Sequence, residues 1–292
     1  MSVERATLSW GEGEIVFDGG TLAPENGLYI AKAGIEGFYS TPQLKVDAVE
    51  RGNGDGAHRV VEQDIHYAQR TVLVHYLAFG SARQQILDAI ESLGQFTHKI
   101  VTFRLQDGER DTFVRGYVMF DVDSLFEEGA TSPATLTIVC DQPTRLSTRT
   151  TIAQLVPSFS GASGGLSYGL SMKGLAYPIN YGEEVSSGAN VVMVHNAGTS
   201  TAFPVLTAYG DFNFLRISWG GKTLEYAAPI GSAPLVLDGA LNGGSATIGG
   251  ADMSRFLRYR SFPQIPPGGD ITLVLESTGT GFVNVETHDA YM

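Results

Sequence analysis

The sequence predicts a mainly β protein, with one helix packed on an antiparallel sheet or barrel in a first domain and an antiparallel β-sandwich in a second. Three observations support this. Short apolar runs alternate with polar residues along most of the chain, glycine contributes 36 of 292 residues, and one stretch has helical periodicity. At roughly 150 residues per domain, the length predicts about two domains.

The first strands are expected between residues 43 and 79. Apolar and polar side chains alternate over residues 43–49, and residues 71–79 are rich in Val, Leu, Tyr and Phe. A glycine-rich loop between them suits the tip of a long hairpin, whose returning leg would be residues 58–69. This loop consists of Arg51, Gly52, Asn53, Gly54, Asp55, Gly56 and Ala57.

A single amphipathic helix is predicted over residues 81–93. Ser81 would cap it, Gln84 stands three residues later as in a capping box, and Gly94 would end it. One face is apolar, which favours packing on a sheet over a helical bundle. The residues of that face are Ile86, Leu87, Ile90 and Leu93.

The rest of the first domain reads as strands. Residues 100–105 alternate, Asp107 and Gly108 turn the chain into residues 112–120, and residues 134–140 alternate again before the break at Pro143. We therefore expect a first domain of residues 1–143, a Gly/Ser-rich connector of residues 144–176 and a sandwich of residues 177–292. The expected strands of the sandwich are residues 191–195, 204–209, 214–219, 235–237, 271–275 and 282–285.

Charge and cysteine content exclude several functions. With 19 basic and 31 acidic residues the net charge is −12, the wrong sign for a nucleic-acid or membrane-surface ligand. A single cysteine, Cys140, excludes an intramolecular disulfide and a cysteine-based zinc cluster. Neither a secretory signal nor an apolar membrane span is recognisable, so we expect a soluble protein made in a cytoplasm.

The sequence indicates no catalytic, cofactor or metal site. Residues 161–165 match G-x-S-x-G, but they lack the strand and helix that expose such a serine, so a linker is favoured. The six histidines show no short ligand spacing, although a long-range site stays open. Residues 121–128 are acidic without the spacing of an EF-hand, and a glycosidase carboxylate pair cannot be identified from sequence.

Aromatic residues of the second domain offer an alternative function. Trp219 and Tyr226, with Tyr259 and Phe262, have the side chains that stack on sugar rings in carbohydrate-binding sandwiches. Packing in the core or at its rim is favoured for them. A sandwich that recognises cell-surface glycans therefore stays as the alternative, and a cell-wall hydrolase without a recognisable nucleophile ranks third.

Taken together, these segments resemble the distal tail proteins of long-tailed bacteriophages. The resemblance is in the spacing of elements over residues 27–292 and contains no reactive residues. In the first domain it includes the basic Arg70 between two β segments, followed by the helix and the hairpin. The matching stretches are residues 56–58, 67–74, 81–93 and 141–143, and in the second domain residues 196–206, 235–238 and 265–270.

The resemblance implies a non-enzymatic virion protein of the tail tip or baseplate, made in the host bacterial cytoplasm. The first domain would form a six-membered ring that continues the tail tube, and the second would be a galectin-like sandwich. Implied partners are further copies of this chain, the tail tube protein, the tail hub or tip protein, and side fibres or receptor-binding proteins for host attachment. No cofactor is implied, and residues 51–57 are the expected subunit-contact loop.

Overall fold

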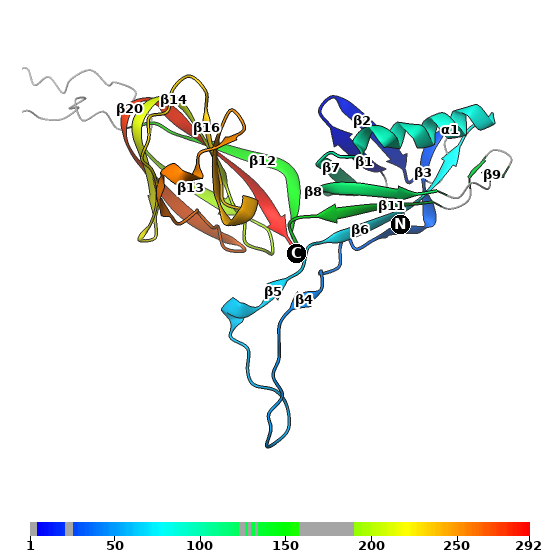
Figure 1. Cartoon of the computed structure of the whole chain (residues 1–292), viewed down its shortest axis with the longest axis horizontal. Helices are drawn as coiled ribbons and strands as arrows, with labels where there is room; N and C mark the ends of the chain where they lie inside the picture. The colour runs from blue at the N-terminus through cyan, green and yellow to red at the C-terminus, as the bar shows by residue number, and fades with distance from the viewer. Residues whose placement is uncertain (1–4, 21–25, 123–125, 128–129, 132–133, 158–189) are drawn as a thin grey trace, which may run out of the picture. The chain divides into compact units, whose positions relative to one another are not determined.

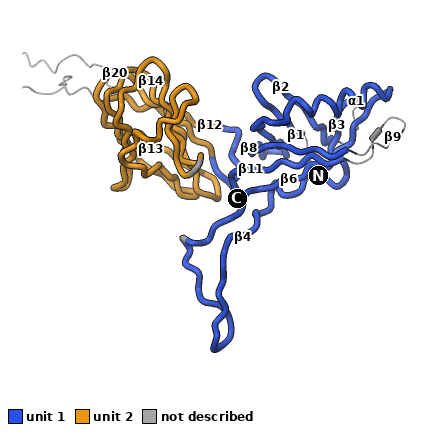
Figure 2. Tube along the Cα trace, viewed as in Figure 1, with its two compact units in different colours: residues 1–149, 289–292 blue, residues 150–288 orange. Residues whose placement is uncertain are grey.

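The computed structural model describes residues 5–20, 26–122, 126–127, 130–131, 134–157 and 190–292 (Figure 1). Its contacts divide the chain into two compact units (Figure 2). Unit 1 contains residues 1–149 and 289–292, and unit 2 contains residues 150–288. The fold is mainly β, as the sequence predicts.

Residues at the start of the expected connector form a strand instead. β12 (Arg145–Leu155) pairs with β8 (Arg110–Asp121) through Leu146 and Phe113. Four of its residues are Thr or Ser, and β-branched threonine favours extended backbone once a partner strand pairs with its backbone. The glycine- and serine-rich part of the connector and Tyr177 lie outside the described residues.

Unit 1 is built around a closed barrel of seven strands. The pairings run β1–β2–β3–β6–β11–β8–β7 and return to β1. Every pairing is antiparallel except the short one between β2 and β3, where Phe17 faces Leu28. The strands are β1 (Arg5–Trp10), β2 (Gly13–Asp18), β3 (Gly27–Glu36), β6 (Thr71–Phe79), β7 (Val101–Asp107), β8 and β11 (Ala134–Cys140). The short strands β9 (Phe126–Glu127) and β10 (Ala130–Thr131) pair with each other, and β10 pairs with the last residue of β6.

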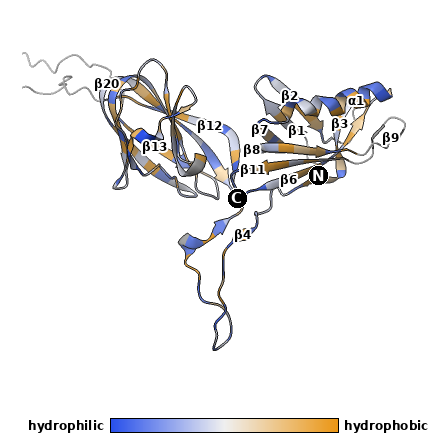
Figure 3. Ribbon diagram, in the orientation of Figure 1, coloured by the Kyte–Doolittle hydropathy of each residue, from blue (hydrophilic) through white to orange (hydrophobic). Residues whose placement is uncertain are grey.

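Alternation along these strands places one face of each in the barrel core. In β6 every second residue is buried, from Val72 to Ala78, and Phe17 packs edge-on against Tyr76. Figure 3 shows hydrophobic residues along the barrel strands and hydrophilic ones on α1. The hydrophobic pattern of period two that predicted the strands is therefore the pattern that fills the core.

The helix α1 (Arg83–Ser92) starts two residues later than predicted and continues into η2 (Leu93–Phe96). Ala82 occupies its N-terminal cap position, and Ser81 instead donates from its backbone N and its Oγ to Oε1 of Gln85. The expected capping box through Gln84 is therefore wrong. The predicted burial of the apolar face holds for Ile86 and Leu93, which are both in the core.

Unit 2 is a sandwich built on two long strands. β14 (Val205–Trp219) and β20 (Gly269–Tyr291) pair along most of their length. The first part of β14 also pairs with β16, whereas its last five residues pair with β15. Each sheet thus contains half of both long strands. The remaining elements are β13 (Val191–Asn196), β15 (Lys222–Tyr226), β16 (Leu235–Asp238), η3 (Leu241–Gly243), β17 (Ser245–Ile248), β18 (Ala251–Asp252), η4 (Ser254–Phe256) and β19 (Leu257–Arg260).

Three glycines let β14 and β20 change sheets together. Gly210, Gly279 and Gly281 all have positive φ, at 122°, 121° and 150°. A Cβ at Gly279 would lie 2.0 Å from the carbonyl oxygen of Asp211, and one at Gly281 would lie 2.1 Å from that of Tyr209. The two backbones approach too closely at the bend for any other residue.

Candidate assembly site

A hairpin arm of residues 41–69 leaves the barrel between β3 and β6 (Figure 1). Its regular structure is small, because β4 (Leu44–Lys45) and β5 (His66–Tyr67) form a ladder of two residues each. The prediction that residues 43–49 and 58–69 form the two long strands of a hairpin is therefore wrong. Alternation alone does not build a strand when no second strand or core lies against its apolar face.

The tip of the arm is a closed turn, as the glycine pattern predicts. Glu50 and Ala57 form an isolated bridge, and the N–H of Arg51 donates to the carbonyl oxygen of Gly56 at 3.0 Å. Gly54 and Gly56 have positive φ, which glycine adopts without steric cost. The residues expected at a subunit contact, 51–56, are all exposed at this tip.

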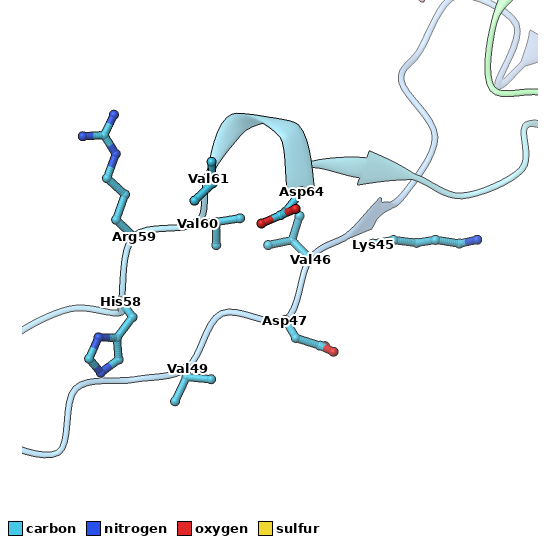
Figure 4. A pocket seen from close by; sticks show the side chains of 9 residues that line it. All are labelled: Lys45, Val46, Asp47, Val49, His58, Arg59, Val60, Val61 and Asp64. Carbon is cyan, nitrogen blue, oxygen red and sulfur yellow. The ribbon is translucent and has the colours of Figure 1, made fainter. Parts of the chain in front are cut away.

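The arm exposes apolar side chains to solvent. Val49 is 66% exposed and Val61 56%, and Leu44 and Ile65 are also exposed. Next to the η1 turn (Glu62–Asp64), the two legs enclose a hollow of about 280 Å³ (Figure 4). Its lining combines Val46, Val49, Val60 and Val61 with the charged Lys45, Asp47, Arg59 and Asp64, and with His58.

An isolated two-stranded hairpin is marginally stable in water, so the arm's root needs a separate anchor. Arg70 provides it from the residue just before β6. Its guanidinium is 1% exposed, and Nη1 donates to the carbonyl oxygens of Gly37, Phe38 and Ser40 at 2.6, 2.8 and 2.6 Å. Nε donates to the carbonyl oxygen of Pro143 at 2.9 Å. One side chain thus joins the residues that lead into the arm, the residue that leaves it and the turn before β12.

Burial lowers the pKa of Arg70 to about 10, and the positive charge of Arg145 adds to this effect. Arg145 is itself 8% exposed and lies over the ring of Tyr39, 4.7 Å from its centroid. It also faces the ring of Tyr291 and donates to the carbonyl oxygen of Met292 at 3.2 Å. The arm's root is therefore tied to residues 289–292 of the same unit. Sequence reasoning missed the structural role of both arginines, since its only signal was a lone Arg before an apolar strand.

The proposed sugar-stacking residues are core residues. Trp219, at the end of β14, is 7% exposed, and Tyr226, at the end of β15, is 1% exposed. Neither ring offers a face to a ligand. Phe262 is 8% exposed as well, whereas Tyr259 on β19 is 57% exposed.

No cluster of three or more His, Cys, Asp or Glu side chains suited to a metal occurs among the described residues. Within those residues, no helix has the length and apolarity to span a bilayer. His75 lies beside Glu36 and His195 beside Asp270, each in a separate exposed pair. The G-x-S-x-G stretch at 161–165 lies outside the described residues.

Comparison with solved structures identifies the fold. The crystal structure of the Dit protein of phage SPP1, described as a paradigm of the hub adsorption apparatus in phages that infect Gram-positive bacteria, superposes with a TM-score of 0.56. The alignment covers 98% of this chain and 99% of that protein at 12% sequence identity. The chain has the fold of a phage Dit protein. The resemblance to distal tail proteins is thereby confirmed at the level of the fold.

Two structures of the activated baseplate of phage P2, with Ca and with Sr, also match with TM-scores of 0.47 and 0.48. They are 12% and 11% identical to this chain over 98% and 97% of its length, and the alignments cover 98% and 97% of those chains. No protein-family model and no curated protein sequence matches the chain. The Dit fold is therefore recognised through its structure and element spacing rather than through sequence identity.

Proposed function

We propose that this protein is a non-enzymatic structural component of a phage tail tip or baseplate. The observation that carries the proposal is the match to the SPP1 Dit fold over nearly the whole of both chains. A match that includes both units supports a shared architecture, whereas a common domain alone would support much less. The protein would be made in the host cytoplasm and reside in the virion, without nucleic-acid or membrane ligands.

Within that role, unit 1 forms a homohexameric ring that joins the tail tube protein to the hub or tip protein. The exposed valines of the arm and its anchored root support this assignment. An apolar arm that projects from a subunit buries its side chains when it contacts the next subunit, and such a heterologous contact, repeated, closes into a ring. Residues 51–57 at the tip would touch the neighbouring subunit or the adjoining ring. The sandwich would attach side fibres or receptor-binding proteins.

Deletion of residues 52–56 tests the ring. Light scattering of the unmodified protein should give the mass of about six subunits, and negative-stain images of the same peak should show a central hole. The deletion variant should keep its far-UV circular dichroism and its thermal midpoint but run as a smaller species. Intact rings from the deletion variant would refute the role of the tip.

A second pair of variants distinguishes the contribution of the arm's apolar legs to ring formation from that of its tip. Val49→Ser with Val61→Ser removes exposed apolar surface without touching the turn, and should also reduce the ring population. Val191→Ser with Met193→Ser is the matched control, because those side chains are 43% and 68% exposed on unit 2. If the control disrupts rings as strongly as the arm variant, the arm is not the assembly contact.

A further inference from the structure

The positive charge of unit 2 is gathered at one edge of one sheet. Its described residues include Arg216, Lys222, Arg255, Arg258 and Arg260 as their only Lys and Arg side chains. They lie on β14, β15, η4 and β19, which are consecutive in space because β15 pairs with both β14 and β19. The seven acidic residues described in the same unit lie on β14, β15, β16, β18 and β20.

Part of this charge is already neutralised within the sheet. The Glu225 carboxylate is 1% exposed and accepts from Nε and Nη2 of Arg216 at 3.1 and 2.8 Å. Nη1 of Arg216 bonds Glu276 at 3.1 Å. Arg258 approaches Glu225 at 3.5 Å but is 72% exposed. Lys222, Arg255 and Arg260 form no ion pair with any described residue.

β19 also has an open side. Among the described residues its single pairing partner is β15, and its last three side chains, Arg258, Tyr259 and Arg260, are exposed. An open edge presents unpaired backbone donors and acceptors that accept another strand. The arginines on this edge determine the charge of the strand that can pair with it. They repel a second β19 edge, since like charges oppose each other, and they attract carboxylates.

We propose that the β19 edge of the sandwich is a docking surface for an acidic, extended polypeptide segment of another protein. The segment adds as a strand to β19, its carboxylates pair with Arg258 and Arg260, and Tyr259 packs on its apolar or aliphatic side chains. This inference rests on the proposed role of unit 2 as an attachment module and names the chemistry of the partner.

The test uses the whole protein and a labelled probe, a ten-residue peptide of alternating Glu and Thr, with binding followed by fluorescence anisotropy at low salt. Arg258→Glu with Arg260→Glu should weaken binding by about tenfold or more, because attraction becomes repulsion. Arg83→Glu with Arg115→Glu in unit 1 changes net charge by the same amount and should leave binding within about twofold of the unmodified protein. Equal losses in both pairs would overturn the proposal, because binding would then follow net charge alone.

Two further probes separate the modes of binding. The same peptide N-methylated at every second residue keeps its charge but cannot form the ladder, so it should bind much more weakly. Equal binding of that peptide, or competition by sulfated dextran as effective as by the peptide itself, would overturn strand addition in favour of a general polyanion surface. The mass of the ring is measured in parallel and tests the proposed assembly role. A failure of that role and a failure of the β19 docking proposal can therefore be told apart.

Discussion

Nε of Arg70 lies 2.9 Å from the carbonyl oxygen of Pro143, while Nη1 of the same side chain bonds three carbonyls at the start of the arm. A charged group buried to 1% exposure is stable only when polar partners replace its water. Four backbone carbonyls supply such partners to Nε and Nη1 here. The planar guanidinium directs its donors along fixed vectors, so it also fixes where the arm leaves the barrel.

Arg70→Lys is expected to destabilise the protein by about 2–4 kcal/mol, because an ammonium cannot reach all four carbonyls and leaves some of them unpaired. Urea unfolding followed by circular dichroism measures the loss. Arg104→Lys is the control, since Arg104 is half-exposed and pairs with Asp111 at the surface. A surface ion pair contributes about 1 kcal/mol or less to the free energy of unfolding. Similar losses in the two variants would show that the Arg70 contacts contribute no more than a surface pair.

Gly279→Ala is expected to cost about 2 kcal/mol or more, because its φ is positive and the new Cβ would collide with the Asp211 carbonyl oxygen. Thermal unfolding of the purified variant is the measurement. Gly231→Ala, where no heavy atom lies within 4 Å of the new Cβ, should change stability little. A Gly279 variant as stable as that control would mean that the bend of β14 and β20 does not depend on glycine.

The pair of Asp111 and Arg104 predicts a pH dependence. Nε and Nη2 of Arg104 donate to the two carboxylate oxygens at 2.8 and 2.5 Å, and this bonding lowers the pKa of Asp111. A carboxylate with a lowered folded-state pKa stabilises the protein above its unfolded pKa of about 3.9 and loses that contribution as pH falls through the folded value. Asp111→Asn should therefore cost up to about 1 kcal/mol at pH 7 and progressively less below about pH 4.

Urea unfolding at pH 7, 4 and 3 measures this difference for Asp111→Asn. Asp18→Asn serves as the comparison, because Asp18 is exposed and makes no ion pair among the described residues. A difference that stays constant with pH would assign the stabilisation to shape or hydrogen bonding rather than to charge.

Cys140 is expected to resist alkylation in the folded protein. It is 1% exposed, and burial raises the pKa of its thiol to about 12, so the reactive thiolate is scarce at pH 8. Pulse labelling with iodoacetamide, read by mass spectrometry, should modify it only after denaturant is added. Rapid labelling under native conditions would show that the barrel opens near β11 on the timescale of the pulse.

The strands and the helix of the first unit were predictable because their signals are local. Residues 71–79 and 134–140 alternate with period two, and the apolar face around Ile86 has helical spacing, so these elements follow from the residues themselves. The glycine turn at residues 52–56 was predictable for the same reason. The structure of the arm's legs was not predictable in this way. Residues 43–49 alternate as a strand would, but no neighbouring sheet pairs with most of them.

The sequence by itself determined the mainly β class, the single helix, the hairpin tip and a spacing of elements that resembles distal tail proteins. Only the tertiary structure decided that Arg70 is a buried anchor, that Trp219 and Tyr226 are core residues, and that the described basic residues of unit 2 lie on the neighbouring elements β14, β15, η4 and β19. The physical reason is that burial and charge environment depend on contacts between residues far apart in the chain. Arg70 and Pro143 are brought together by the closure of the barrel, and no local pattern encodes that contact.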